Sequence, residues 1–385
     1  MGENHRPSVS SRSAGAANII PSGKPKTVKM KPRQWYSRFG FSLPASPGKS
    51  VVALFRALLG RDPEPSAIRA YGGLGSVEAI ARSIASSVEF RQRHSSPFWH
   101  YRARFDPVAL MHKYAAPQPK PRADLIVNFL DVAIAPKFLP AILGSMPREV
   151  QPMPLPANWH ADIAEFGAVL RAIDLSKGSF TMAELGCGWG CWMVNSCVPA
   201  KRHGRSVHAI GVEGDPGHVA FAREAAQLNG LTPDEVTLHH AIASGTDGYA
   251  LFPLQDKAGH SWGLQAVFDA TAEQRERAAR EKTHTELRSM SLASVAGDRR
   301  LDLLHIDIQG AEVDVVRSGL DFISSKVAYM VIGTHSRQIE GRLMDLLQGR
   351  GWSLDIERPA ILALDREQPY VEVDGVQGWR NLALT

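Results

Sequence analysis

The spacing of apolar positions divides the chain into zones. Residues 1–48 show no apolar periodicity and are rich in Ser, Pro, Gly and Lys, a composition that predicts a disordered segment. From residue 51, apolar positions recur at helical spacing in three short runs that end near residue 95. Beyond residue 157, apolar runs of strand length alternate with amphipathic runs of helix length. The pattern predicts a disordered tail, a small helical module and an α/β domain.

The helical module is expected over 49–96. Gly60 ends the first amphipathic run, Asp62 is a candidate N-cap for the second helix, and Ser76 is a candidate N-cap for the third. The runs LFRALLGRDPEPSAIRAYGG and IASSVEFRQR resemble a short helical module found in bacterial surface-associated and glycan-modifying proteins. A generic helical hairpin remains the alternative, and neither interpretation places chemistry here.

The stretch over 97–156 is aromatic and proline-rich and predicts a connector with short helices. From 157 to 385, strands alternate with helices, which predicts a doubly wound, mostly parallel sheet with helices on both faces, a Rossmann-like α/β architecture. An insert over about 245–286 is expected to form a lid at the binding edge of this sheet. The expected strands cover 180–185, 206–213, 236–243, 301–307, 328–333 and 352–357.

A glycine turn follows the first strand of the sheet. In the run AELGCGWGCW, Glu184 precedes Gly186, Gly188 and Gly190, and Cys187 lies inside the turn. Glycine tolerates positive φ and lets the backbone approach a ligand closely. Turns at the carboxyl ends of parallel strands commonly hold ligands beside a helix N-terminus. The spacing is G-x-G-x-G, not the dinucleotide G-x-G-x-x-G. A turn that only packs the strand against the helix is the alternative.

The second strand ends in an acid. Glu213, followed by Gly214, closes the apolar run SVHAIGVE about one β-α-β unit after the glycine turn. A carboxylate at this place can accept hydrogen bonds from both hydroxyls of an adenosyl ribose. Asp215 and Pro216 favour a helix start, so Glu213 could equally be an ordinary helix-start acid. Its pairing with the glycine turn favours cofactor binding.

The most specific run is LDLLHIDIQGAEVDVVRSG, in which a buried strand leads into Asp307. With the glycine turn and RSMSLASVAGD upstream, it resembles the FkbM-type methyltransferase family over about residues 160–355. The resemblance implies a class I methyltransferase fold and S-adenosyl-L-methionine as cofactor. It implies acceptors that are hydroxyl groups of sugars, polyketides and related small molecules. The residues expected to bind the cofactor are Glu184, Gly186, Cys187, Gly188, Gly190, Glu213, Gly214 and Ala241.

Two residues are candidates for catalysis. His335 follows the strand over 328–333; the corresponding strand of the family commonly ends in a similarly placed His, usually after an acid, where this chain has Gly333 and Thr334. A hydroxyl is a poor nucleophile at neutral pH, and histidine is suited to be its general base. Asp307 is the rival: it could be the base, orient His335 or line the methionine end of the cofactor. The segment that carries His335 offers no second carboxylate, so we expect no metal.

Glu312 lies at the end of the same family-specific run. A carboxylate also favours a helix N-terminus, and that ordinary role is the stronger interpretation of Glu312 from the sequence.

Charge and cysteine content narrow the classes of protein to which the chain could belong. The net charge of +5 comes from residues 1–50, which hold nine Lys/Arg and one acid, while the rest of the chain is slightly acidic. This distribution and the lack of an N/D-P-P-Y/F motif disfavour a nucleic-acid methyltransferase. The basic tail could contact a membrane surface or a partner enzyme. Three cysteines and no evident signal peptide lead us to expect a cytoplasmic protein.

The sequence thus predicts an S-adenosylmethionine-dependent O-methyltransferase that acts on a hydroxyl of a sugar, a glycan or a related small molecule. The alternative is a catalytically inactive scaffold with a degenerate methyltransferase fold; the intact glycine turn, Glu213 and Asp307 argue against it. A nicotinamide-dependent oxidoreductase is disfavoured by the glycine spacing. The identity of the acceptor and the oligomeric state do not follow from the sequence.

Overall fold

The computed structural model describes residues 47–59, 61–87, 89–90 and 102–385. The tail predicted over 1–48 lies outside these residues except for its last two. The chain divides into two compact units, Met1–Ser95 and Ser96–Thr385, and each is described by itself.

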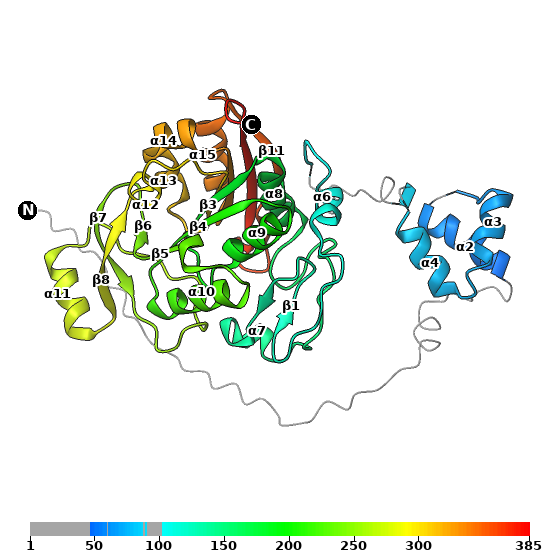
Figure 1. Ribbon diagram of the computed structural model, residues 1–385, viewed down its shortest axis with the longest axis horizontal. Helices are drawn as coiled ribbons and strands as arrows, with labels where there is room; N and C mark the ends of the chain where they lie inside the picture. Colours follow the sequence, from blue (N-terminus) through cyan, green and yellow to red (C-terminus); the bar gives the residue numbers. More distant parts are fainter. Residues whose placement is uncertain (1–46, 60, 88, 91–101) are drawn as a thin grey trace, which may run out of the picture. The chain divides into compact units, whose positions relative to one another are not determined.

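Among the described residues of the first unit, a helix lies in each of the three runs where the apolar spacing predicts one (Figure 1). Ser76 caps the third helix as expected, since its hydroxyl accepts a hydrogen bond from the Ala79 N–H at 3.1 Å. Asp62 does not cap the second helix: its carboxylate accepts a hydrogen bond from Arg56 instead, and the N-cap is Glu64. The helices are α2 (Pro47–Leu59), α3 (Pro65–Gly72) and α4 (Val77–Ala85).

The core of this unit comes from the apolar faces of α2 and α4, as amphipathic periodicity requires. The resemblance to a module of bacterial surface proteins has no support from the structure and stays a prediction. The buried apolar residues are Val51, Phe55, Leu59, Ile80 and Ile84.

The second unit is built on a seven-stranded sheet of order β11-β14-β10-β9-β3-β4-β5. Five neighbouring strands run parallel, and β14 is antiparallel to both β10 and β11. The predicted mostly parallel α/β sheet is confirmed. The strands are β3 (Ser179–Leu185), β4 (Ser206–Glu213), β5 (Val236–His240), β9 (Leu303–Ile306), β10 (Tyr329–Thr334), β11 (Trp352–Arg358) and β14 (Gly375–Asn381).

Alternate residues of β3 show that helices cover both faces of the sheet. Phe180 and Met182 pack in one core cluster with α8 and α9, whereas Ala183 and Leu185 pack in another with α13, α14 and α15, as the two-residue period of a strand demands. The helices are α8 (Ile163–Leu175), α9 (Cys191–Arg202), α10 (Pro216–Leu228), α12 (Leu292–Ala296), α13 (Glu312–Ser318), α14 (Leu320–Lys326) and α15 (Arg337–Leu347).

The segment predicted as a connector is packed into the larger unit. Met111, Tyr114, Ile126 and Phe138 are buried in the same core cluster as α8 and α9. The apolar residues that punctuate this proline-rich stretch therefore give it a fixed position on the sheet's helical layer. Its elements are α6 (Pro107–Tyr114), β1 (Ile126–Val127), β2 (Ala133–Ile134), η1 (Pro136–Phe138) and α7 (Pro140–Leu143).

The predicted strand over 236–243 splits into two. β5 ends at His240, and the Ala241 N–H donates to the Glu213 carbonyl at 3.0 Å, which places Ala241 beside the end of β4. The chain then enters a separate three-stranded sheet of order β6-β8-β7 that, with α11, forms the insert. These elements are β6 (Ile242–Ala243), β7 (Gly248–Pro253), α11 (Ala272–Glu281) and β8 (His284–Met290).

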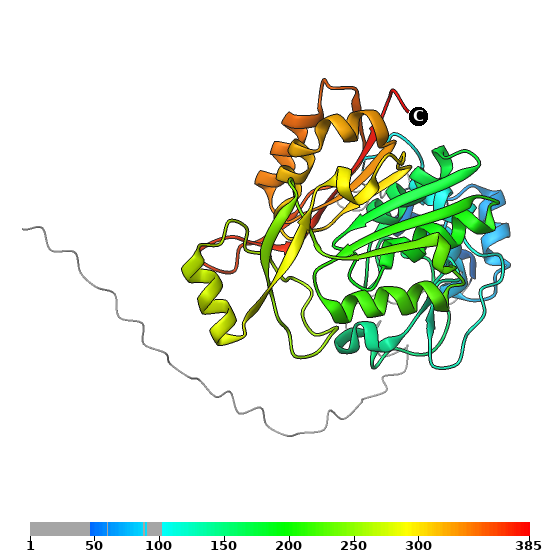
Figure 2. The same ribbon diagram turned by 60° about the vertical axis from the view of Figure 1, so that its left-hand side comes forward.

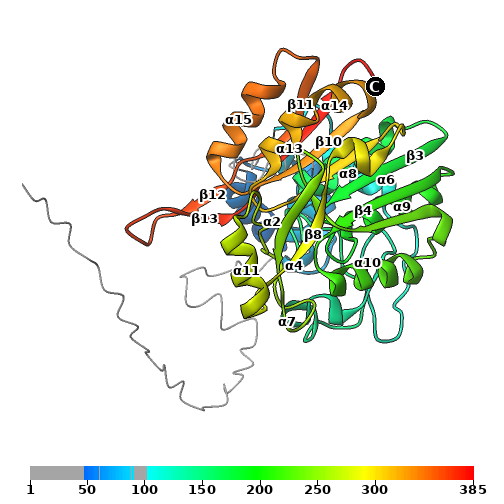
Figure 3. The ribbon, with the colours of Figure 1, turned by 90° about the vertical axis from the view of Figure 1, so that its left-hand side faces the viewer.

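The insert stands out from the main sheet on the side where a short hairpin, β12 (Ile361–Ala363) and β13 (Tyr370–Val373), also projects (Figures 2 and 3). The hairpin leaves the sheet between β11 and β14, and β14 begins opposite the end of β10. Among the described residues, no helix is long and apolar enough to cross a bilayer.

Candidate active site

A cavity of about 630 Å³ lies at the carboxyl ends of β3, β4 and β9. Small-molecule sites in proteins typically have volumes of about 300–1,000 Å³, so this cavity is large enough for a ligand that consists of a nucleoside and an attached substituent. The strand order reverses at β3, which has β4 on one side and β9 on the other, and open α/β sheets bind ligands at such switch points. Predicted site residues that line the cavity are Gly186, Gly188, Glu213, Gly214, Ala241 and Asp307.

The glycine turn requires its glycines. Gly186 and Gly188 have φ of 75° and 52°, a region that side chains with a Cβ rarely adopt. A Cβ on Gly186 would lie 2.0 Å from the Asp307 carbonyl oxygen, and one on Gly188 would lie 2.7 Å from the Trp262 ring. The turn is thus closely enclosed by the segment after β9 on one side and by the insert on the other.

Three residues of the turn that were predicted to bind cofactor do not line the cavity. Glu184 is buried, and its carboxylate accepts hydrogen bonds from the Trp192 and Met193 N–H groups at 3.1 and 2.8 Å; burial raises its pKa to about 7. It therefore satisfies the free N–H groups at the start of α9. Gly190 is the N-cap of α9. Burial raises the pKa of Cys187 well above its usual range, so its thiol is neutral. Their contact with a cofactor stays a prediction.

Glu213 links the two predicted cofactor elements. Its Oε2 accepts a hydrogen bond from the Gly188 N–H and its Oε1 from the Asp215 N–H, both at 2.8 Å. The helix-capping role belongs to Asp215, whose carboxylate accepts from the His218 N–H at 2.8 Å. Glu213 is therefore a carboxylate fixed at the cavity wall by backbone donors.

The insert closes over the glycine turn through His218 in the first turn of α10. The His218 Nε2 accepts a hydrogen bond from the Gly259 N–H at 3.1 Å, so its Nδ1 carries the proton. The ring stacks on Trp262 with centroids 4.0 Å apart and planes 6° apart, and the Trp262 Nε1–H donates to the Gly259 carbonyl at 3.1 Å. Phe252 also lines the cavity, whereas Tyr249 is exposed outside it. The insert thus covers the binding edge.

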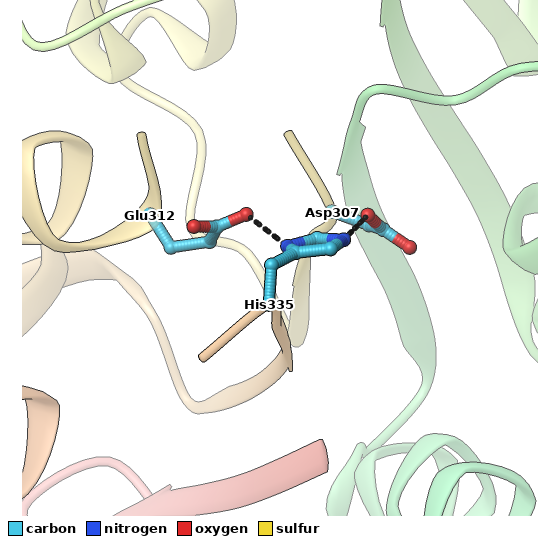
Figure 4. A group of neighbouring side chains, drawn as sticks. All are labelled: Asp307, Glu312 and His335. Carbon is cyan, nitrogen blue, oxygen red and sulfur yellow. Dashed lines mark hydrogen bonds and ion pairs between the residues drawn. The ribbon is translucent and has the colours of Figure 1, made fainter. Parts of the chain in front are cut away.

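Three titratable side chains lie in a row beside the carboxyl end of β9 (Figure 4). Asp307 follows β9, His335 follows β10 and Glu312 begins α13. The His335 Nε2 lies 3.2 Å from the Asp307 Oδ1, and its Nδ1 lies 2.9 Å from the Glu312 Oε1. The side chains of Asp307, His335 and Glu312 are 42%, 14% and 0% exposed, and of the three only Asp307 lines the cavity. The structure brings the two predicted catalytic residues into direct contact.

Electrostatic interactions set the charges of the His335 and Asp307 side chains. Burial opposes the charge of His335, but hydrogen bonds and attraction from Asp307 and Glu312 outweigh burial and raise its pKa to about 10. Burial likewise opposes the charge of Asp307, but the hydrogen bond and charge of His335 hold the pKa of that carboxyl below its usual range. At neutral pH His335 is an imidazolium whose two N–H groups are both engaged. The geometry favours Asp307 over His335 as the group that meets an acceptor.

Glu312 is the site residue whose role was missed from the sequence. Besides His335, its Oε1 accepts hydrogen bonds from the Ile308 and Gly310 N–H groups at 3.2 and 3.0 Å. Its position at the end of the family-specific run was the available signal, but a helix-start acid explained that position equally well.

Asp307, Glu312 and His335 also form a group of side chains that could hold a metal ion. The sequence offers no second carboxylate next to His335, but the structure supplies one, that of Glu312 at the start of α13. The two carboxylates contact opposite nitrogens of the ring. A cation bound to one ring nitrogen of His335 would displace the carboxylate there from its hydrogen bond. The other carboxylate would stay hydrogen-bonded to the second ring nitrogen.

A further cluster lies at the start of α9, outside the cavity lining. The His160 Nε2 contacts the Cys191 Sγ, and Trp192 stacks between His160 and His305 with centroids 5.4 and 5.5 Å away. Burial lowers the pKa of His160 to about 4, so this ring is neutral near pH 7. The cluster packs the helix that the glycine turn begins.

Comparison with known proteins adds three kinds of match. The family model described as "Methyltransferase FkbM domain" matches residues 176–351. A protein from Jannaschia sp. (strain CCS1) named "Putative methyltransferase" is 41% identical over 257 residues, which are 67% of this chain and 92% of the relative.

Solved structures resemble the chain more distantly. Methyltransferase FkbM from Methylobacillus flagellatus KT is 11% identical, with 56% of this chain and 54% of that chain covered and a TM-score of 0.34. Ribosomal protein L11 methylase from Lactobacillus delbrueckii subsp. bulgaricus is 12% identical, with 61% and 85% covered and a TM-score of 0.31. M. capricolum TrmK in complex with S-adenosyl-homocysteine is 9% identical, with 55% and 67% covered and a TM-score of 0.28. Nothing about ligands follows from likenesses at this level.

Proposed function

Because the chain belongs to the FkbM methyltransferase family, we propose that it transfers a methyl group from S-adenosyl-L-methionine to a hydroxyl of a sugar, a glycan or a related small molecule. The observation that carries the proposal is the cavity, which the glycine turn, Glu213 and Asp307 all line. A cofactor site and a reactive carboxylate thus face one space.

The cavity residues fit this cofactor. Each oxygen of Glu213 has one backbone donor, and since a carboxylate oxygen can accept two hydrogen bonds, acceptor capacity remains for two ribose hydroxyls. Ala241, Ile242 and Phe252 provide an apolar wall next to Glu213, suited to a purine ring. Gly186 and Gly188 offer backbone with no side chain in the way.

When bound, S-adenosyl-L-methionine supplies the electrophilic methyl carbon and the leaving group. The protein's task is to hold an acceptor oxygen on line with the bond that breaks. Asp307 is suited to this task because it is ionised, lines the cavity and is held from behind by His335. Its carboxylate can accept the hydrogen bond of the acceptor hydroxyl and so direct an oxygen lone pair; such positioning can account for about 7–11 kcal/mol of a barrier.

The proton has a defined destination in this arrangement. Methylation would make the acceptor oxygen strongly acidic, so even a carboxylate of low pKa could accept its proton. Asp307 takes that proton and passes it to water when the product leaves. His335, already protonated, keeps Asp307 ionised for the next turnover.

Calorimetric titration with S-adenosyl-L-methionine and S-adenosylhomocysteine tests the cofactor half of the proposal. We expect both to bind, and Glu213→Ala to weaken binding by at least about tenfold, which is 1.4 kcal/mol. Absence of binding by a sample that circular dichroism shows to be folded would favour the scaffold alternative. A panel of glycosides, assayed by the mass gain of one methyl group, then tests the acceptor class.

A further inference from the structure

We propose that Glu312 is a positioning residue of the methyl-transfer site: it orients the His335 ring so that the ring holds the Asp307 carboxylate in place at the cavity. This inference rests on the proposed methyl transfer. It assigns a role to a buried acid that the proposed reaction does not itself use.

The hydrogen bonds of Glu312 show that it does not serve its own helix. A helix-start acid would accept from the N–H groups of the first turn of α13. The donors to Glu312 are instead the Ile308 and Gly310 N–H groups, which precede the helix, and the His335 ring, which follows another strand. The N-cap of α13 is Ala311, and no side-chain hydrogen bond caps the helix. Glu312 lies in the first turn of α13, as expected of a helix-start acid, but its carboxylate does not cap that helix.

Because Glu312 is buried, its contact with His335 strongly restricts the orientation of the His335 ring. The Glu312 side chain is 0% exposed, and an ionised carboxylate out of water is costly unless donors or positive charge compensate it. His335 is the charged donor among its three partners. Rotation of the imidazole away from Glu312 would leave a buried charge poorly compensated, so the ring stays in the orientation that places its Nδ1 on Glu312.

The fixed ring in turn fixes Asp307. With Nδ1 on Glu312, Nε2 must point toward the Asp307 Oδ1, 3.2 Å away. The Gln309 Nε2 also donates to Oδ1, at 3.4 Å, so Oδ2 is the oxygen left for an acceptor hydroxyl. A Cβ on Gly333 would lie 3.3 Å from the Asp307 Cγ and 3.4 Å from its Oδ2, so the carboxylate lies where only a glycine leaves room for it. The chain Glu312–His335–Asp307 thus sets which carboxylate oxygen meets the acceptor.

The orientation of the His335 ring depends on both carboxylates. Asp307 after β9 and Glu312 on α13 contact its two nitrogens at 3.2 and 2.9 Å. Replacing Glu312 by Gln removes one of these two carboxylates. The ring is then held on one side only, and its contact with Asp307 is no longer fixed.

The test compares steady-state kinetics of the full chain with those of Glu312→Gln, Glu312→Asp and Asp321→Asn. Asp321 is an exposed acid on α14 and serves as the matched control. For Glu312→Gln we expect kcat to fall by about 100-fold, the loss typical of a misplaced reacting group. Binding of S-adenosyl-L-methionine should be unchanged. Glu312→Asp should recover part of kcat, and Asp321→Asn should match the wild type.

A wild-type kcat for Glu312→Gln would overturn the inference, as would an equal loss of cofactor binding. The NMR signal of the His335 Nδ1–H, which needs no acceptor, separates this inference from the proposed function. If the wild type shows no methyl transfer but this signal changes in Glu312→Gln, the positioning contact stands and the reaction falls. If Glu312→Gln does not fold, Glu312→Asp decides, because a displaced carboxylate must still change the signal of the hydrogen-bonded Nδ1–H.

Discussion

The two walls of the cavity are held by different means. On the wall where we propose that the cofactor binds (the cofactor wall), Glu213 is held by the backbone N–H groups of Gly188 and Asp215. On the wall where we propose that the reaction takes place (the reaction wall), Asp307 is held by side chains, chiefly His335, with Glu312 behind it. Backbone donors come with any sequence that forms the turn, whereas the side-chain clamp depends on three residues from separate elements. The cofactor wall should therefore respond mainly to changes in backbone conformation, and the reaction wall to changes in side-chain charge.

Substitution of Asp307 should have the largest effect and separate the two walls most sharply. For Asp307→Asn we expect kcat to fall by about 10²–10⁴-fold, the range for loss of a group that accepts a proton. Binding of S-adenosyl-L-methionine should change little, because the glycine turn and Glu213 are untouched. Single-turnover assays with calorimetry on the same sample measure both. Near-normal turnover in this variant would remove Asp307 from the reaction.

The next largest effect is expected from a substitution in the glycine turn. Gly188→Ala should weaken cofactor binding by about tenfold or more, 1.4 kcal/mol, since its Cβ would lie 2.7 Å from the Trp262 ring. Gly204 also has positive φ, at 78°, but a Cβ there would meet no atom within 4 Å. Gly204→Ala therefore controls for backbone strain alone. If both variants bind cofactor equally well, the close approach of Trp262 to the turn has no bearing on binding.

A pH effect on stability tests the packing that supports the glycine turn. The pKa of His160 is about 4 in the fold and about 6.5 when unfolded. The unfolded chain therefore binds the proton more readily, so stability should fall as pH drops from about 6.5 toward 4, by at most about 3 kcal/mol. Chemical denaturation at about pH 7 and about pH 4.5 measures the loss. His160→Gln should show a smaller loss, and an unchanged pH dependence would count against this assignment.

Removal of metal should have the smallest effect. The hydrogen bonds that His335 makes with Asp307 and Glu312 compensate these carboxylates without an ion, so we expect prolonged dialysis against a chelator to leave kcat within about twofold, under 0.5 kcal/mol of barrier. A tenfold loss that Mn²⁺ or Mg²⁺ restores would show that the reaction wall is a metal site, and metal analysis of the dialysed sample is the control.

Local features were predictable because each follows from neighbouring residues. The strands of the parallel sheet, the left-handed glycines and the acid at the end of β4 depend on short-range patterns, and they lie where the sequence places them except that the strand predicted over 236–243 ends at His240. The antiparallel strand β14 was not predicted: its run GVQGWRN lacks an apolar pattern, and pairing with β10 and β11 on both sides decides its conformation.

The sequence by itself determined the α/β fold class, the glycine turn and Glu213, because strand periodicity and glycine conformation are properties of contiguous residues. Only the tertiary structure decided which charged side chains come into contact at the cavity. Glu312 and His335 are 23 residues apart, and a sequence does not reveal whether a buried acid meets its own helix or the loop after another strand. The same holds for His218 and Gly259, whose contact sets the insert over the turn. Such pairings depend on where the sheet brings the ends of its strands together.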